Sequence, residues 1–264
     1  MTTVKDVFDC LNKLAPVELK MDFDNVGILV GSAKSPVTRC LIALDITDDV
    51  IDEASALGAN LIVSHHPVIF NELKSVIDED LTGRKLIKLI KNDISAICMH
   101  TNLDIAEGGV NDALMSSLGG HVSGYLEPCG TDADGNKVGC GRIGVLPDTM
   151  DLNSFLALCK NALCVNGLRY HDAGLPVKKL AVMGGSGGSC IALAKACGCD
   201  TYVTSDIKYN GFLDAKELGI NIIDADHFCT ENVIVPVLYE KLAAQFPKIS
   251  FSISKIHKQT AQFF

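Results

Sequence analysis

The chain has 264 residues, of which 48 % are hydrophobic and 21 % are charged, and this balance excludes a disordered protein. Its formal net charge of -9 argues against a protein that coats duplex nucleic acid, because phosphate contacts require clustered Lys and Arg. No apolar run reaches the ~20 residues that span a bilayer, so we expect a compact globular protein of one large or two modest domains.

The N-terminal residues and the cysteines both bear on localisation. Residues 1–16 lack the pattern of a secretion signal and predict an amphipathic helix with five inward side chains: Val4, Val7, Phe8, Leu11 and Leu14. The 11 cysteines are odd in number and include no Cys-x-x-Cys pair, which is typical of reduced thiols in the cytosol. We therefore expect a cytoplasmic protein without a thiolate zinc site.

The first half of the chain alternates strand-like apolar runs with helical patterns. Continuous β-branched runs separated by helices are typical of a parallel sheet covered on both faces. The predicted strands cover residues 39–47, 60–66 and 94–104, and the predicted helices cover residues 48–58, 84–93 and 109–119.

Glycines and turn formers dominate residues 124–150, which predicts either a boundary or the hairpin strands of a second unit. The alternation then resumes, with predicted helices over 152–164, 189–199, 212–219 and 229–247 and strands over 178–185, 200–206, 220–226 and 249–254. We expect two α/β lobes with mixed or parallel sheets, residues 1–124 and 125–264, and a C-terminal segment able to pack back on the first lobe.

Three predicted strands end in side chains that commonly bind metals. In open α/β sheets functional groups gather beyond the carboxyl ends of the strands, so these side chains should converge. The three sets are His65 with His66, His100 with Asp104, and His227 with Glu231. Imidazole and carboxylate together suit zinc, iron, manganese, cobalt or nickel, and the pattern favours two ions over one.

Other histidines have a more ordinary explanation. A lone histidine is usually a surface or hydrogen-bonded residue, which we expect of His121, His171 and His257. His100 lies beside the strand end, where it is either a ligand or a group that orients Asp104 or a substrate.

A glycine-rich turn, "VMGGSGGS", follows the strand over 178–185. Backbone amides of Gly184, Gly185, Ser186 and Gly187 are candidates for holding a phosphate or carboxylate. The turn matches neither a Walker motif nor a dinucleotide fingerprint, and close strand–helix packing explains the glycines equally well.

Eight motifs occur in an order that resembles the GTP cyclohydrolase 1 type 2 family, also called the Nif-three-like family. They are "FDNVGILVG", "SHHPVIF", "HTNLD", "GVND", "GRIG", "GGSGGS", "YVTSDIKY" and "DADHFCTE". The resemblance implies a Nif-three-like fold whose two lobes hold a pair of divalent ions between them, commonly in a toroidal homohexamer. It also implies the metal ligands His65, His66, Asp104, His227 and Glu231, with Glu231 shared by both ions.

The chain departs from the family pattern at three places. Members often have Trp where Phe23 stands, Thr-Gly-Asp in place of Thr204, Ser205 and Asp206, and His where Asn210 stands. The first is a mild apolar exchange. The last affects chemistry, because an amide cannot relay a proton as imidazole does.

These features predict a metal-dependent hydrolase acting on a nucleotide-like or phosphate-bearing small molecule. His100 or Asp206 would handle protons, and the glycine-rich turn would hold the phosphate. The alternative is a non-catalytic metal-handling or protein-interaction protein, which Asn210 favours. The sequence leaves open the metal, among iron, zinc and manganese, and the substrate.

Overall fold

The structure, a computed structural model, describes residues 1–132 and 134–264, which form two compact units. Unit 1 comprises Met1–Leu103 and Val235–Lys258, and unit 2 comprises Asp104–Ile234 and Gln259–Phe264. The chain passes from unit 1 to unit 2 within helix α4 (Thr101–Ile105) and returns at the start of α10 (Ile234–Gln245). The boundary expected at residues 124 and 125 falls inside strand β5 (His121–Thr131).

Unit 1 contains a five-stranded sheet in the order β1-β4-β3-β2-β11. Strands β2, β3, β4 and β11 run parallel, and β1 pairs antiparallel with β4 at one edge. The bounds are β1 Gly27–Val30, β2 Arg39–Ala43, β3 Leu61–Ser64, β4 Ser95–Cys98 and β11 Ser250–Ile253. Strands β2 and β3 lie in the parallel centre of the sheet, where both faces are buried, and this explains why their sequences are continuous apolar runs.

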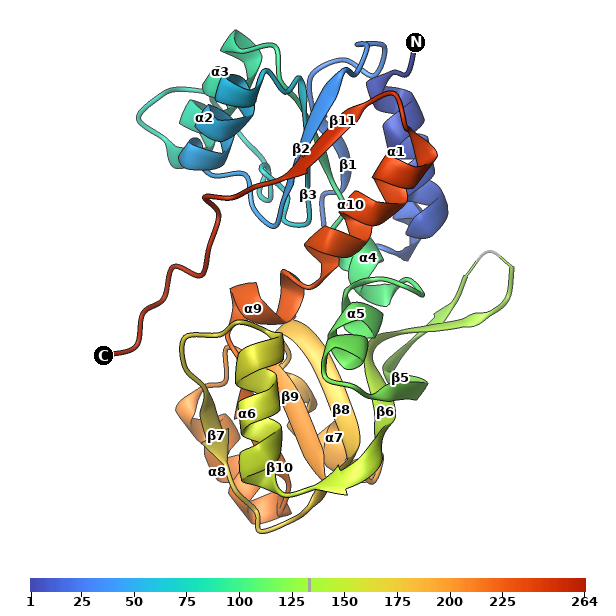
Figure 1. Cartoon of the computed structure of the whole chain (residues 1–264), viewed down its shortest axis with the longest axis vertical. Coiled ribbons are helices and arrows are strands. Elements are labelled where there is room, and N and C mark those ends of the chain that lie inside the picture. The colour runs from blue at the N-terminus through green and yellow to red at the C-terminus, as the bar shows by residue number, and fades with distance from the viewer. Residues whose placement is uncertain (133) are drawn as a thin grey trace. The chain divides into compact units, whose positions relative to one another are not determined.

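Helices cover both faces of this sheet (Figure 1). On one face lie α2 (Asp48–Leu57) and α3 (Leu81–Lys91), which pack on the sheet through apolar side chains such as Ile51 and Leu89. On the other face lie α10 and α1 (Val4–Leu14), and α1 buries Val4, Val7 and Leu11. Thr3 begins α1 with a capping box, so the predicted N-terminal helix is present. A short 3-10 turn, Val17–Leu19, follows it.

Unit 2 contains a six-stranded mixed sheet in the order β5-β6-β8-β9-β10-β7. Strands β8, β9 and β10 run parallel, whereas β5, β6 and β7 pair antiparallel. The remaining bounds are β6 Lys137–Met150, β7 Arg169–His171, β8 Val177–Ser186, β9 Thr201–Ser205 and β10 Asn221–Asp224. The glycine-rich region 124–150 is therefore the β5–β6 hairpin.

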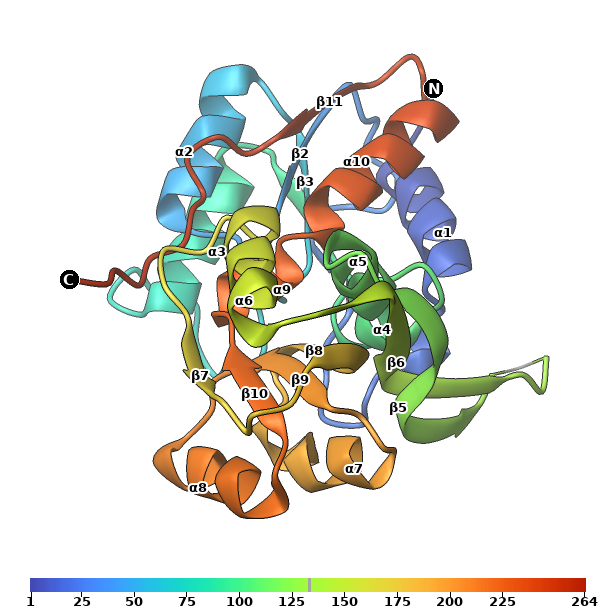
Figure 2. The same ribbon diagram turned by 60° about the horizontal axis from the view of Figure 1, so that its bottom comes forward.

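The helices of unit 2 also lie on both faces of its sheet. One face carries α5 (Val110–Ser117), α6 (Leu152–Ala162) and α9 (His227–Glu231), whose apolar side chains form one buried cluster with the strands. Figure 2 shows α7 (Ile191–Ala196) and α8 (Tyr209–Leu218) on the face opposite α6. The short 3-10 turn Gly188–Cys190 leads into α7. The predicted mixed α/β fold with two lobes is confirmed.

The helix predicted over residues 229–247 is wrong as a single element, because α9 ends at Glu231 and α10 begins at Ile234. Pro236 has no backbone N–H to donate to the carbonyl of Asn232, so a continuous helix would lose that bond. Proline is tolerated in the first turn of α10, where the N–H has no helical partner. None of the helices within the described residues has the length and apolar character that a membrane span requires.

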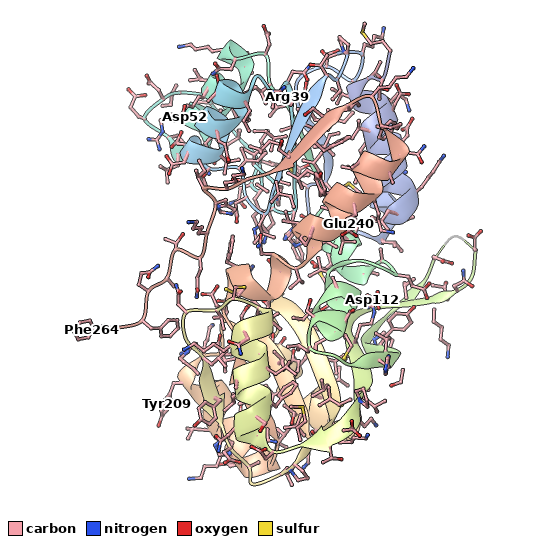
Figure 3. All side chains as sticks on the ribbon, in the orientation of Figure 1. Arg39, Asp52, Asp112, Tyr209, Glu240 and Phe264 are labelled. Atoms are coloured by element: carbon pink, nitrogen blue, oxygen red, sulfur yellow. The ribbon has the colours of Figure 1, made fainter. Side chains whose placement is uncertain are left out.

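Arg142, the arginine of "GRIG", ties two helices to the sheet of unit 2. Its side chain is 1 % exposed and forms a bidentate pair with Asp112 on α5, at 3.0 Å from Nε and 2.8 Å from Nη2 (Figure 3 labels Asp112). Its guanidinium also donates to four backbone carbonyl oxygens: those of Ile105, Ala106, Gly139 and Gly141. Since Ile105 ends α4, Arg142 fixes the segment that carries Asp104.

Replacing Arg142 with Met should destabilise unit 2 by about 3–5 kcal/mol, because it removes one partner of a buried pair and four hydrogen bonds to backbone carbonyls. The matched control is Arg84→Met, which removes a solvent-exposed pair with Asp48 and should leave the stability close to that of the parent. Urea unfolding of the metal-free protein followed by circular dichroism measures both, since the chain has no Trp. Equal costs for the two variants would contradict this role of Arg142.

Candidate metal centre

Three histidines of unit 1 cluster where β3 and β4 end. The backbone amides of His65 and His66 both donate to the carbonyl of Leu44, at 3.1 Å and 2.9 Å, and this fixes the turn after β3. The ring centroids of His65 and His66 lie 4.9 Å apart, and His100 lies 5.2 Å and 5.4 Å from them. One ring nitrogen from each residue lies within 4.8 Å of the other two, which is close enough for a shared cation.

Every imidazole of this cluster has an acceptor at Nδ1. Nδ1 of His65 lies 2.8 Å from the carbonyl oxygen of Met99, and Nδ1 of His66 lies 2.8 Å from Oδ1 of Asp45. Nδ1 of His100 lies 2.7 Å from Oδ1 of Asp24. We assign the proton to Nδ1 in each case, since carbonyl and carboxylate oxygens only accept. This tautomer presents Nε2 as the electron-pair donor that a metal requires.

The two aspartates behind these rings are held in the ionised form. Burial alone would raise the pKa of Asp24, but hydrogen bonds from His100 and Thr101 outweigh it and hold that pKa well below its usual range. Burial likewise opposes ionisation of Asp45, and bonds from His257 and His66 outweigh it, so its pKa also lies well below its usual range. Both carboxylates therefore accept from imidazole at neutral pH.

In unit 2 the predicted ligands lie on two short helices. Asp104 is on α4, while His227 and Glu231 begin and end α9, four residues apart and therefore on one face. Carboxylate oxygens of Asp104 and Glu231 lie within 4.8 Å of each other, and Glu231 is only 4 % exposed. Two like charges held this close in a buried place favour a bound cation, because positive charge offsets their repulsion.

His227, like the three histidines of unit 1, has an oxygen acceptor at Nδ1. Its Nδ1 lies 2.8 Å from Oδ2 of Asp206, and its Nε2 lies 3.1 Å from Oε2 of Glu231. Burial would lower the pKa of His227, but the carboxylates of Glu231 and Asp206 outweigh it and raise that pKa to about 9. A metal that binds Nε2 at neutral pH therefore displaces a proton.

The glycine-rich turn lies beside Glu231. The amides of Gly184, Gly185 and Gly187 donate to side-chain oxygens of Asn111, Thr230 and Thr204 at 2.9 Å, 3.1 Å and 3.0 Å. Gly185 has a φ of +64°, and a Cβ there would overlap Oε1 of Glu231. These contacts match the packing explanation of the glycines, with Gly185 leaving room for the carboxylate.

A cavity of about 300 Å³ opens at the end of this turn in unit 2. Its lining combines hydroxyls, a carboxylate, an amide and one ammonium group from Ser186, Ser189, Asp206, Lys208 and Asn210, with Gly188 and Gly211. Asp206 thus borders the cavity and also holds His227. Asn210, the departure from the family pattern, is exposed here, and the neighbouring Tyr209 is 80 % exposed (Figure 3).

A second cavity, of about 440 Å³, adjoins the histidine cluster of unit 1. His66 and Asp45 form part of its wall, and Phe70, Thr82 and Lys85 form another part. Phe70 also contacts the ring of His100 edge to face, with centroids 6.0 Å apart. It packs in the same way on Phe23, which is 65 % exposed although it is large and apolar. An aromatic surface therefore borders the imidazoles.

The structure thus brings together His65, His66 and His100 within unit 1, and Asp104, His227 and Glu231 within unit 2. His121 is exposed at the start of β5, and His171 is partly buried on β7. Sequence reasoning missed Asp24 and Asp45, which hold the rings of His100 and His66. It expected His257 to be a surface or hydrogen-bonded residue, and His257 is hydrogen-bonded to Asp45. Asp45 follows β2 as His65 follows β3, so its position at a strand end was a usable signal.

Comparison with known proteins identifies close relatives. The sequence model described as Duf34/NIF3 (NGG1p interacting factor 3) matches residues 2–261. A Clostridium perfringens protein named GTP cyclohydrolase 1 type 2 homolog is 37% identical over 262 residues, covering 98% of this chain and 99% of the relative. A protein of the same name from Clostridium acetobutylicum is 37% identical over 254 residues, covering 94% of this chain and 92% of the relative.

Solved structures agree with these sequence matches. The crystal structure of a Bacillus cereus protein related to NIF3 superposes with a TM-score of 0.93 at 27% identity, covering 100% of both chains. A Staphylococcus aureus hypothetical protein superposes with a TM-score of 0.91 at 30% identity, covering 99% of both chains.

Replacing Gly185 with Ala should cost about 1–2 kcal/mol for the left-handed backbone and should also displace Glu231, which weakens metal binding. The matched control is Gly188→Ala, whose new Cβ would lie no closer than 3.8 Å to Ile207 and should be tolerated. Thermal unfolding and Zn²⁺ titration of both variants test this. Unchanged zinc affinity in the Gly185 variant would contradict the packing role.

Proposed function

Because the chain belongs to the Duf34/NIF3 family, as its motifs predicted, we propose that it binds a pair of divalent ions. The proposed ligands are His65, His66, Asp104, His227 and Glu231, with Glu231 shared by both ions. The observation that carries the proposal is that each imidazole of this set has an acceptor at Nδ1, which presents Nε2 to a cation.

The chemistry of the donors supports this assignment. Unit 1 supplies imidazoles, and unit 2 supplies two carboxylates with one further imidazole, so we propose that ligands from both units serve the same ions. Such a mixture suits iron, zinc or manganese better than calcium or magnesium, which prefer oxygen ligands. A cation also offsets the repulsion between Asp104 and Glu231.

We propose further that the site is that of a metal-dependent hydrolase acting on a nucleotide-like or phosphate-bearing small molecule. When bound, the ions would supply an activated water and positive charge against the developing anion. His100 resembles a general base held by a carboxylate, since Asp24 accepts from its Nδ1 and leaves Nε2 to exchange a proton. Asp206 holds His227 and borders the cavity of unit 2, where it can receive a proton from substrate.

The phosphate of the substrate would be held in the cavity of unit 2. The amides of Gly184, Gly185 and Gly187 have internal partners, so the part of the predicted loop available to an anion is its far end. There the hydroxyls of Ser186 and Ser189 face the same cavity as the ammonium group of Lys208. A hydroxyl pair and one cation suit a single phosphate group.

A non-catalytic role in metal handling or protein interaction is the second candidate. Asn210 borders the cavity where relatives often have His, and its amide cannot relay a proton at neutral pH. The description of the matching family names an interacting factor. In this case the ions would serve assembly, storage or transfer.

We propose a cytoplasmic homohexamer as the working form of the protein. All 11 cysteines are free thiols, and most of them are buried as small apolar side chains. The hexamer follows from the family resemblance.

Turnover by the metal-reconstituted protein tests the hydrolase. A panel of nucleotides, including GTP because of the relatives' name, and of simple phosphoesters should contain a substrate whose hydrolysis falls to background in His65→Ala. The control is His121→Ala, which changes an exposed side chain remote from both clusters in sequence and should retain full activity. If no compound in the panel is hydrolysed, or if hydrolysis is unchanged in His65→Ala, the hydrolase is refuted and metal handling is favoured.

A further inference from the structure

The chain segment after β11 is fixed against β2 and α2 of unit 1. Strand β11 pairs in parallel with β2, and the amide of Ser254 continues the ladder by donating to the carbonyl of Ile42 at 2.9 Å. The hydroxyl of Ser254 and the amide of Lys255 donate to the two carboxylate oxygens of Glu53 on α2, at 2.5 Å and 2.9 Å. These bonds place the next residues at the carboxyl end of β2.

His257 comes from this segment and reaches Asp45. Its side chain is 11 % exposed, its amide donates to the hydroxyl of Ser254 at 3.2 Å, and its Nε2 lies 2.9 Å from Oδ2 of Asp45. The backbone N–H of Asp45 also points at this Nε2 from 3.2 Å, and it would donate to Nε2 in the other tautomer of His257. We assign the proton to Nε2, because an ionised carboxylate at the shorter distance requires a donor.

Asp45 therefore joins two imidazoles through its two oxygens. Oδ2 accepts from His257, and Oδ1 accepts from Nδ1 of His66 at 2.8 Å. The terminal torsion of an aspartate is broad, so one hydrogen bond to His66 would leave the carboxylate free to turn. The second bond, from a residue 212 positions away in sequence, removes that freedom.

We propose that His257 is a positioning residue for the metal centre, holding Asp45 so that the ring of His66 points its Nε2 at one ion. The inference rests on the proposed metal site, in which His66 is a ligand. Ring orientation matters because loss of the group that hydrogen-bonds a metal ligand commonly costs about 10–100-fold in metal affinity. Asp45 is that group for His66, and His257 acts one hydrogen bond further from the ion, so its loss should cost the lower end of this range.

The effect should be confined to one ion. Nδ1 of His65 is held by the backbone carbonyl of Met99 and Nδ1 of His227 by Asp206, whereas Nδ1 of His66 is held by Asp45. Loss of His257 should therefore act chiefly on the ring orientation of His66. The ion that His66 binds should become the weaker of the two.

Zinc titration of the full chain, with chelator competition to separate the two binding events, tests the proposal. His257→Ala should weaken the binding of one ion by about 10-fold and leave the binding of the other unchanged. His257→Gln, whose side-chain amide can still donate to Asp45, should restore most of that loss. His171→Ala, on β7 of unit 2, is the control and should bind both ions as the parent does.

The results distinguish a failure of the positioning role of His257 from a failure of the proposed metal site. Parental affinities in His257→Ala, or an equal loss of both ions, would overturn the positioning role. If His66→Ala also binds both ions normally, the proposed metal site itself fails. Circular dichroism of the metal-free variants checks that they fold. If His257→Ala unfolds, Asp45→Asn is measured in its place and should likewise weaken the binding of one ion only. Parental affinities, or an equal loss of both ions, would again overturn the positioning role.

Discussion

The candidate site depends on one repeated interaction, the hydrogen bond from Nδ1 of an imidazole to an oxygen behind it. His65, His66, His100 and His227 each make it, to one backbone carbonyl and three different aspartates. Each bond fixes both the tautomer and the ring orientation, and it presents Nε2 toward neighbouring ligand groups. A core packed only for stability gains nothing from four oriented imidazoles, whereas a metal centre requires them.

The fold positions the imidazoles and their acceptors at strand ends and on short helices. In unit 1 the parallel strands β2, β3 and β4 end together, which brings Asp45, the two adjacent histidines and His100 to one edge of the sheet. In unit 2, Arg142 holds the segment after Asp104, and Gly185 leaves room for Glu231. The arginine of "GRIG" and the first glycines of "GGSGGS" thus support candidate ligands by hydrogen bonding and close packing.

The candidate ligands could be named from the sequence because their signals are local. A run such as "LIVS" ending in two histidines, or His227 four residues before Glu231, is visible without knowledge of the fold. Sequence reasoning missed Asp24, Asp45 and His257 as partners because packing brings them in from 76, 21 and 212 positions away. It also missed the short edge strands β1 and β7, which carry little periodicity, and merged α9 with α10 across Pro236.

We propose that this chain holds two divalent ions on oriented imidazoles and buried carboxylates. Elemental analysis of freshly purified protein, with anomalous scattering to identify the metal, counts those ions. Two bound ions per chain give a metal-to-protein ratio near two. A ratio near one would support a single-ion site and contradict the shared role of Glu231, and protein that stays metal-free after reconstitution would show that the chain has no metal centre.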